Sequence, residues 1–177
     1  VCTSCSAGTY QVAGGRTSCD SCAAGYYCEA TGLSTYAAYP CAAGQYSEAR
    51  ADSCSLCDTG KYAASSASPE CDSCLAGWHQ TERGKTSCDS CSGGTFSAAT
   101  GASLASACEA CAAGKYSADA AAVCTSCSSG TYQDAAGMNS CDSCKAGYYC
   151  ETTGLDTYAA HPCPVREYSQ AGASLCT

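Results

Sequence analysis

Cysteine spacing is the feature that most constrains how this chain folds. Of its 177 residues, 21 are cysteine. A share above about 8–10 % in a short chain is typical of a disulfide scaffold. Sixteen of these cysteines form eight CxxC pairs that recur along the chain. The cysteines therefore predict a fold built from many small, cross-linked units.

Aliphatic side chains are too scarce to build an ordinary core. The chain has six Leu, four Val, one Phe and no Ile. A chain of this kind cannot bury enough apolar surface to offset its conformational entropy, so it needs covalent cross-links to fold. Disulfides persist in oxidising compartments. We therefore expect a secreted protein at the cell surface or outside the cell.

The charge balance excludes one class of partner. The formal net charge is −8, and the chain has only eight lysines and arginines. Nucleic-acid binding requires a basic surface, which this composition does not supply. No apolar run approaches the roughly 20 residues of a membrane-spanning helix, so no transmembrane segment is expected in this window. No signal peptide is visible at Val1, and we expect a mature or internal fragment.

A short unit, C-x-x-C-x-x-G-x-aromatic, repeats throughout the chain. The glycine is predicted to adopt a positive φ in a tight turn, and the aromatic ring is predicted to cover the adjacent disulfide. G-x-Y segments predict short strands in small hairpins, and the alanine-rich stretch 97–107 predicts a helical turn. The unit departs from its pattern at His79, which stands in the aromatic position, and at Arg166, where a different turn is expected because glycine is missing. The glycines are Gly8, Gly25, Gly44, Gly60, Gly77, Gly94, Gly114, Gly130 and Gly147.

A longer period lies above the short one. Residues 1–55 match residues 123–177 at an offset of 122, with 37 identities. We therefore divide the chain into one full super-repeat, 1–122, and the start of the next, 123–177. Such repetition predicts a longer tandem array in which each unit contacts mainly its neighbours.

The repetition also limits how the cysteines can pair, although spacing alone does not establish connectivity. We expect the second cysteine of each CxxC pair to bond forward to the first cysteine of the next. The expected disulfides are Cys5–Cys19, Cys41–Cys54, Cys57–Cys71, Cys74–Cys88, Cys91–Cys108, Cys111–Cys124, Cys127–Cys141 and Cys163–Cys176.

Two cassettes carry an additional cysteine. CDSCAAGYYC at 19–28 returns as CDSCKAGYYC at 141–150. The forward rule leaves Cys22 to pair with Cys28, and Cys144 to pair with Cys150. The alternative is an interleaved pattern in which Cys22 or Cys28 reaches Cys41. The forward scheme leaves only Cys2 without a partner, as expected if its partner lies in an upstream repeat.

Zinc sites and redox centres also use CxxC pairs. Successive CxxC pairs are close to a four-cysteine zinc spacing, but they run in unbroken tandem and five cysteines lie outside them. A redox CxxC centre needs a βαβ context that is not visible. We therefore expect no metal and no cofactor. The aspartates of the CDSC segments predict an Asx turn inside the pair; they are Asp20, Asp72, Asp89 and Asp142.

The units resemble a known family. CxxCxxGxY segments, alternating with CxxGYYC and then PCxxGxYS, are similar to the ephrin-receptor-like cysteine-rich repeats, and more distantly to EGF-like and TNF-receptor modules. The resemblance covers essentially the whole chain. It implies an extracellular protein, because such repeats occur in receptors and in large surface proteins of protists and algae.

From these observations we expect a protein that is not an enzyme. The fold class expected is a small disulfide-rich repeat protein, an elongated rod of short β-hairpins and loops with little helix. The function expected is a structural coat, appendage or filament that associates with itself, with O-glycans in the Ser/Thr-rich loops 65–70 and 97–107 and with glycans as further partners. The alternative is a receptor or adhesin ectodomain. Tyr36, Tyr39 and Tyr158 are the candidate packing or contact residues.

Overall fold

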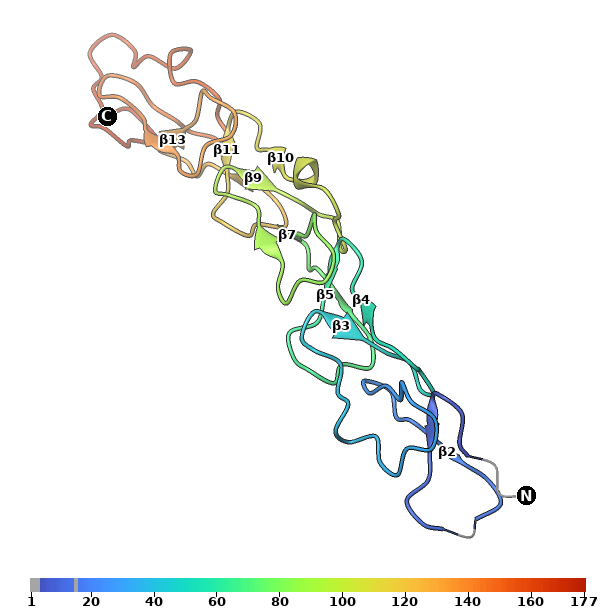
Figure 1. Cartoon of the computed structure of the whole chain (residues 1–177). Coiled ribbons are helices and arrows are strands. Elements are labelled where there is room, and N and C mark those ends of the chain that lie inside the picture. The colour runs from blue at the N-terminus through green and yellow to red at the C-terminus, as the bar shows by residue number, and fades with distance from the viewer. Residues whose placement is uncertain (1–3, 15) are drawn as a thin grey trace. The chain divides into compact units, whose positions relative to one another are not determined.

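The computed structural model describes residues 4–14 and 16–177. In these residues the regular structure consists of two-residue strands, paired as seven separate two-stranded sheets, and one short 3₁₀ helix (Figure 1). The predicted series of short hairpins with little helix is confirmed, while the elongated rod stays a prediction. Among the described residues, no helix has the length and apolar character needed to cross a membrane.

The chain divides into two compact units. The first comprises Val1–Cys74, His79–Asp89 and Gly101–Leu104. Three antiparallel hairpins lie in it. They are β1 (Thr9–Tyr10) with β2 (Asp20–Ser21), β3 (Gln45–Tyr46) with β4 (Ser55–Leu56), and β5 (Lys61–Tyr62) with β6 (Asp72–Ser73).

The second unit comprises Leu75–Trp78, Ser90–Thr100 and Ala105–Thr177. It contains the 3₁₀ helix η1 (Ala105–Ala107), inside the stretch predicted to form a helical turn. Its hairpins are β9 (Thr95–Phe96) with β10 (Glu109–Ala110), β11 (Lys115–Tyr116) with β12 (Thr125–Ser126), and β13 (Thr131–Tyr132) with β14 (Asp142–Ser143). The remaining hairpin pairs β7 (Trp78–His79) with β8 (Asp89–Ser90). The division at residue 122 stays a prediction.

Each hairpin has the same origin in the sequence. Its first strand is the segment that follows the motif glycine, and its second strand is the two residues enclosed by the next CxxC pair, as in Lys61–Tyr62 with Asp72–Ser73. The disulfide Cys57–Cys71 closes the loop beside this hairpin. The Asx turn predicted inside the CDSC pairs was therefore wrong. The aspartates lie in strands, because the enclosed dipeptide is extended to reach across to the preceding strand.

The motif glycines adopt the predicted backbone conformation, with φ between 78° and 87°. A side chain would not fit at most of these positions. A Cβ built on Gly94, for example, would overlap the carbonyl oxygen of Gly137. Arg166 also has a positive φ of 79°. The expectation of a different turn at Arg166 was therefore wrong, because the backbone keeps the left-handed conformation without glycine.

A regular set of long-range backbone hydrogen bonds connects the repeats within each unit. At one step of this ladder, the N–H of Gly94 donates to the carbonyl of Ser117 and the N–H of Cys111 donates to the carbonyl of Gly94, both at 2.8 Å. Equivalent pairs recur at the other motif glycines, from Gly8 with Cys28 to Gly147 with Ser169. The ladder satisfies polar backbone groups that would be costly to bury unpaired.

A second set of left-handed residues was not predicted. Each of these residues donates its N–H to the carbonyl of a motif cysteine, as Ala120 does to Cys91 at 2.8 Å. Several are glycines, such as Gly154, but Arg50, Ala67 and Ala120 hold φ of 71°, 58° and 59°. The geometry is needed at every repeat, whereas glycine is not present at every repeat.

We expect Ala120→Gly to stabilise the second unit by about 0.5–1 kcal/mol. Glycine removes the roughly 1–2 kcal/mol cost of a left-handed L-residue, and the greater freedom of the unfolded chain offsets part of the gain. Guanidinium denaturation with the disulfides intact measures the change. Gly154→Ala is the matched reverse substitution, since the nearest atom to its Cβ is 3.6 Å away, and it should destabilise. A lower midpoint for Ala120→Gly would contradict this reasoning.

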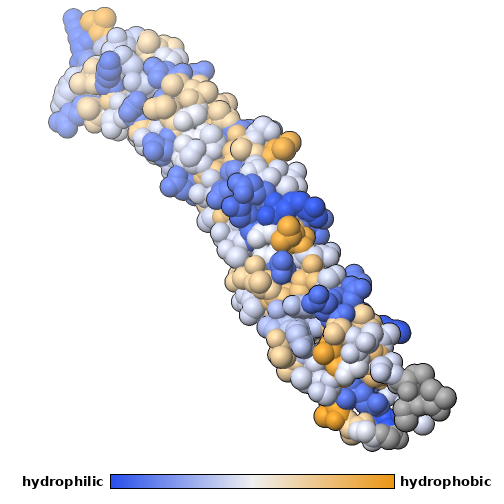
Figure 2. Space-filling model, viewed as in Figure 1, coloured by the Kyte–Doolittle hydropathy of each residue, from blue (hydrophilic) through white to orange (hydrophobic). Residues whose placement is uncertain are grey.

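The core consists of disulfides. The second cysteines of the CxxC pairs are almost fully buried, with Cys57, Cys74 and Cys127 at 0 % exposure. Large aliphatic side chains lie mostly outside, including Leu75 at 69 % and Val165 at 93 %. On the face shown in Figure 2, apolar residues form small patches among polar ones. Cross-links thus occupy the place of the aliphatic core that the composition lacks.

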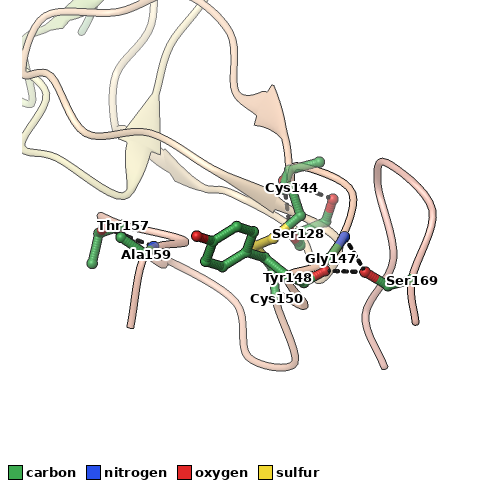
Figure 3. Close-up of a disulfide and its surroundings, with 9 residues drawn as sticks. Ser128, Cys144, Gly147, Tyr148, Cys150, Thr157, Ala159 and Ser169 are labelled. Atoms are coloured by element: carbon green, nitrogen blue, oxygen red, sulfur yellow. Dashed lines mark hydrogen bonds between the residues drawn. A yellow bond between two sulfur atoms is a disulfide. The ribbon is translucent and has the colours of Figure 1, made fainter. Parts of the chain in front are cut away.

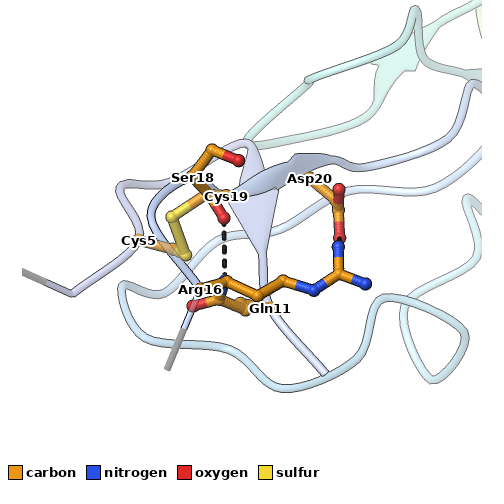
Figure 4. A network of polar contacts seen from close by, with 6 residues as sticks. All are labelled: Cys5, Gln11, Arg16, Ser18, Cys19 and Asp20. Atoms are coloured by element: carbon orange, nitrogen blue, oxygen red, sulfur yellow. Dashed lines mark hydrogen bonds and ion pairs between the residues drawn. A yellow bond between two sulfur atoms is a disulfide. The ribbon is translucent and has the colours of Figure 1, made fainter. Parts of the chain in front are cut away.

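Glutamine side chains brace three of the disulfide loops. Gln11 donates from its amide to the Ser18 carbonyl at 2.8 Å, beside the Cys5–Cys19 disulfide and the Arg16–Asp20 ion pair at 3.6 Å (Figure 4). Gln80 and Gln133 make the equivalent bond across seven residues, to Ser87 and Ser140. Gln80 and Gln133 are buried, so their amides satisfy loop carbonyls from inside the fold.

Candidate functional site: the paired tyrosine clusters

In the described residues, twenty cysteines form ten disulfides that join the same pairs as the forward rule. These are Cys5–Cys19, Cys22–Cys28, Cys41–Cys54, Cys57–Cys71, Cys74–Cys88, Cys91–Cys108, Cys111–Cys124, Cys127–Cys141, Cys144–Cys150 and Cys163–Cys176. Cys41 bonds to Cys54 and not to Cys22 or Cys28, unlike in the interleaved alternative. Cys2 lies outside the described residues. Sulfurs joined in disulfides offer no thiolates to zinc.

The additional cysteines fill a recurrent buried position. The residue after the motif aromatic points inward, and in other repeats it is Ser47, Ser97 or Gln133, each at most 3 % exposed. In the two cassettes this position holds Cys28 and Cys150, both at 0 % exposure. Sequence reasoning missed this position, although the run of small or polar residues directly after each aromatic signals it.

The turn beside the additional disulfide is held from the following repeat. The Ser169 hydroxyl donates to the Tyr148 carbonyl at 2.6 Å and lies 3.1 Å from the Gly147 N–H, which donates to it (Figure 3). The first cassette has the corresponding bond from Ser47 to the Tyr26 carbonyl at 2.8 Å. In both cassettes, therefore, the backbone of the first tyrosine in the Tyr-Tyr pair is fixed by a serine of the following repeat.

Three tyrosines meet at each cassette, one of them from the preceding hairpin strand. The Tyr36 ring centroid is 4.9 Å from that of Tyr10 and 5.1 Å from that of Tyr26. The second cassette repeats this cluster, with Tyr158 at 4.8 Å from Tyr132 and 5.0 Å from Tyr148. The tilted and edge-to-face arrangements are those that aromatic rings prefer. We call these sets the first and the second tyrosine cluster.

The central tyrosine of each cluster, Tyr36 or Tyr158, lies in the segment that follows the additional disulfide. An isolated antiparallel bridge, Tyr26 to Pro40, returns this segment to the cassette, and Tyr148 to Pro162 repeats it. A further ring pair stands beside each bridge. It is Tyr27 with Tyr39 at 5.8 Å in the first cassette, and Tyr149 with His161 at 5.6 Å in the second.

The predicted contact residues Tyr36, Tyr39 and Tyr158 all belong to these aromatic contacts, and each is half-buried. They pack against other aromatic rings and keep part of each ring at the surface. The partners Tyr10 and Tyr132 come from strands β1 and β13, far earlier in the chain, so sequence spacing did not identify them.

The second cluster also contains a disulfide and a cation. Tyr132 is buried together with Cys144 and Cys150, which confirms at this position that the motif ring covers a disulfide. Burial raises the pKa of the Tyr132 hydroxyl, and the nearby carboxylates of Asp134 and Asp142 add to the shift. Lys145 lies with its ammonium nitrogen 5.0 Å from the Tyr158 ring centroid. A hydrogen bond to Tyr158 raises the pKa of Lys145.

The surface grooves of the first unit are lined by polar groups. One, of about 340 Å³, is bordered by Tyr27, Glu29, Gln45 and Asp52, with Ser53 and Cys54. Carboxylates, an amide and a tyrosine hydroxyl can exchange hydrogen bonds with a polar partner. The groove can therefore form hydrogen bonds with a polar partner at the protein surface.

A comparison with protein-family models identifies the same kind of cysteine-rich repeat as the fold does. The model described as tyrosine-protein kinase ephrin type A/B receptor-like matches residues 60–108 and 114–157, which together make up more than half of the chain. The chain belongs to the ephrin-receptor-like cysteine-rich repeat family. A search of the curated proteins finds no matching relative.

Membership in this family supports an extracellular location for the chain. Tandem disulfide-rich repeats of the ephrin-receptor-like type are typical of extracellular proteins, and ten disulfides fit an oxidising compartment. No catalytic domain is identified in the chain.

Proposed function

We propose that this ephrin-receptor-like repeat chain is an extracellular structural protein that associates with itself into a coat, appendage or filament. The observation that carries the proposal is the repetition of one set of contacts along the chain. The same glycine-to-carbonyl bonds and the same forward disulfides recur from repeat to repeat within each unit. Such repetition suits a structural role, because the same contacts can be repeated along an assembly.

The correspondence at an offset of 122 residues extends to three-dimensional contacts. The Cys22–Cys28 and Cys144–Cys150 disulfides, the Tyr26–Pro40 and Tyr148–Pro162 bridges, and the two tyrosine clusters are each equivalent pairs. Units related by one repeated operation that does not close generate an open filament. The recurrence of whole cassettes supports this mode of assembly.

Exposed hydroxyl groups support the glycoprotein part of the proposal. Ser65 and Ser66 lie in the loop 65–70, and Thr100 and Ser103 lie in 97–107, all at the surface. Ser/Thr-rich loops of secreted chains are common positions for O-glycans. Glycans there would add a hydrated layer without disturbing the disulfide core.

Imaging of native material tests the proposal. Electron microscopy of protein purified from its source, without reductant, is expected to show filaments or sheets, and intact mass spectrometry is expected to show a mass above that of the polypeptide. The matched control is the same preparation after reduction and alkylation, in which the assemblies should be lost. Native material that contains only dispersed monomers would refute the structural role.

A receptor or adhesin ectodomain is the second candidate, and the family match favours it. In that role the repeats would hold a binding surface away from a membrane. The sequence on both sides of this chain separates the two functions. A membrane anchor with a signalling domain would favour the receptor, whereas many further super-repeats would favour the filament.

A further inference from the structure

The two tyrosine clusters differ in the cation beside the central ring, and Asp134 near Tyr132 is replaced by Val12 in the first cluster. The cassettes 19–41 and 141–163 are aligned without gaps and differ at four positions. One of these positions is Lys145 in the second cassette and Ala23 in the first. Lys145 places an ammonium group over the central ring, whereas the alanine has no group that reaches the equivalent ring.

In the second cluster, a lysine side chain of the same chain lies over the central ring. The Lys145 nitrogen lies 5.0 Å from the Tyr158 centroid, within the distance at which an aromatic face attracts a cation. Tyr158 in turn contacts the rings of Tyr132 and Tyr148, so the ammonium group lies over the central ring of the three.

The first cluster has the same rings in the same arrangement. The distances from Tyr36 to Tyr10 and Tyr26 differ by only 0.1 Å from their counterparts. Tyr10 is half-buried, whereas its counterpart Tyr132 is buried. Arg16, in the loop between β1 and β2, pairs its guanidinium with Asp20 at 3.6 Å (Figure 4).

We propose that the first cluster, with Tyr36 at its centre and Tyr10 and Tyr26 beside it, binds the ammonium group of a lysine side chain presented by a partner protein. Lys145 is the internal equivalent of that ligand in the second cluster. The net charge of −8 favours the approach of a cationic surface. The site is a surface contact and is independent of whether the chain forms filaments.

A titration with Nα-acetyl-lysine methylamide tests the proposal. The disulfide-intact chain, with its tyrosine rings isotope-labelled, is followed by nuclear magnetic resonance, and Tyr36→Phe and Tyr158→Phe variants assign the two central rings. The Tyr36 signals are expected to shift and the Tyr158 signals to remain, because Lys145 already occupies the second ring. The same probe acetylated on its side-chain nitrogen has no charge and should shift neither ring.

Two reciprocal substitutions complete the test. Ala23→Lys should weaken the apparent association at Tyr36 by roughly two- to fivefold, the range that one exposed cation–π contact supplies. Lys145→Ala should make Tyr158 respond as Tyr36 does in the unaltered chain. Both variants are on exposed or half-buried positions, and peptide mapping verifies that their disulfides are intact. Equal responses of the two rings in the unaltered chain, or a Tyr36 response unchanged by Ala23→Lys, would overturn the proposal.

Discussion

Reduction of the disulfides is expected to unfold the chain completely. Each loop of 13 to 17 residues, such as Cys91–Cys108, removes roughly 3 kcal/mol of unfolded-state entropy. With ten disulfides in the described residues, this contribution exceeds the 5–15 kcal/mol net stability of an ordinary domain. Buried aliphatic side chains cannot compensate, because Leu75 and Val165 lie at the surface.

Near-ultraviolet circular dichroism and size-exclusion chromatography, before and after dithiothreitol, measure this effect. The tyrosine signal should be lost and the elution volume should fall as the chain expands. A chelator without reductant is the matched control and should change neither quantity. If the chelator alone unfolded the chain, metal ligation would replace disulfides as the source of stability.

The second large effect is expected for Gly94→Ala. The substitution places a side chain on a left-handed residue, which costs about 1–2 kcal/mol. It also forces the new Cβ against the carbonyl of Gly137, and the required backbone shift adds about 1–3 kcal/mol. We therefore expect a loss of about 3 kcal/mol in the free energy of unfolding of the second unit.

Gly147→Ala separates these two causes. Gly147 has nearly the same φ, 82° against 87° for Gly94, but a Cβ there meets no atom within 4 Å. It should lose only the roughly 1–2 kcal/mol of the left-handed backbone. Guanidinium denaturation of both variants with intact disulfides measures the difference. Equal losses would mean that the contact between repeats contributes nothing.

The sequence predicted the local features well because they depend on short separations. Cysteines 13 or 14 residues apart can meet after a single turn, as Cys57 and Cys71 do. The glycine three residues after a cysteine marks a tight turn, and its φ follows from that geometry. Even so, Arg166 holds the same conformation, so the turn is imposed by the repeat as well as by the residue type.

The candidate site was only partly predictable. Tyr36, Tyr39 and Tyr158 were selected because they lie in the segments that follow the additional cysteines, and all three are in aromatic contacts. Their partners Tyr10 and Tyr132 are 26 residues earlier in the chain. No local pattern relates such distant positions, because the contact depends on how one repeat is placed on the next.

What the sequence alone determined was the cross-linked repeat itself, namely the CxxC hairpins, the left-handed glycines and the family to which they belong. The tertiary structure decided which positions face inward and which distant residues meet. It alone revealed the left-handed Ala67 and Ala120, the buried position taken by Cys28 and Cys150, and the tyrosine clusters. The physical reason is separation along the chain. Turns and short disulfide loops are governed by neighbouring residues, whereas the ladder and the clusters arise only when repeats pack on one another.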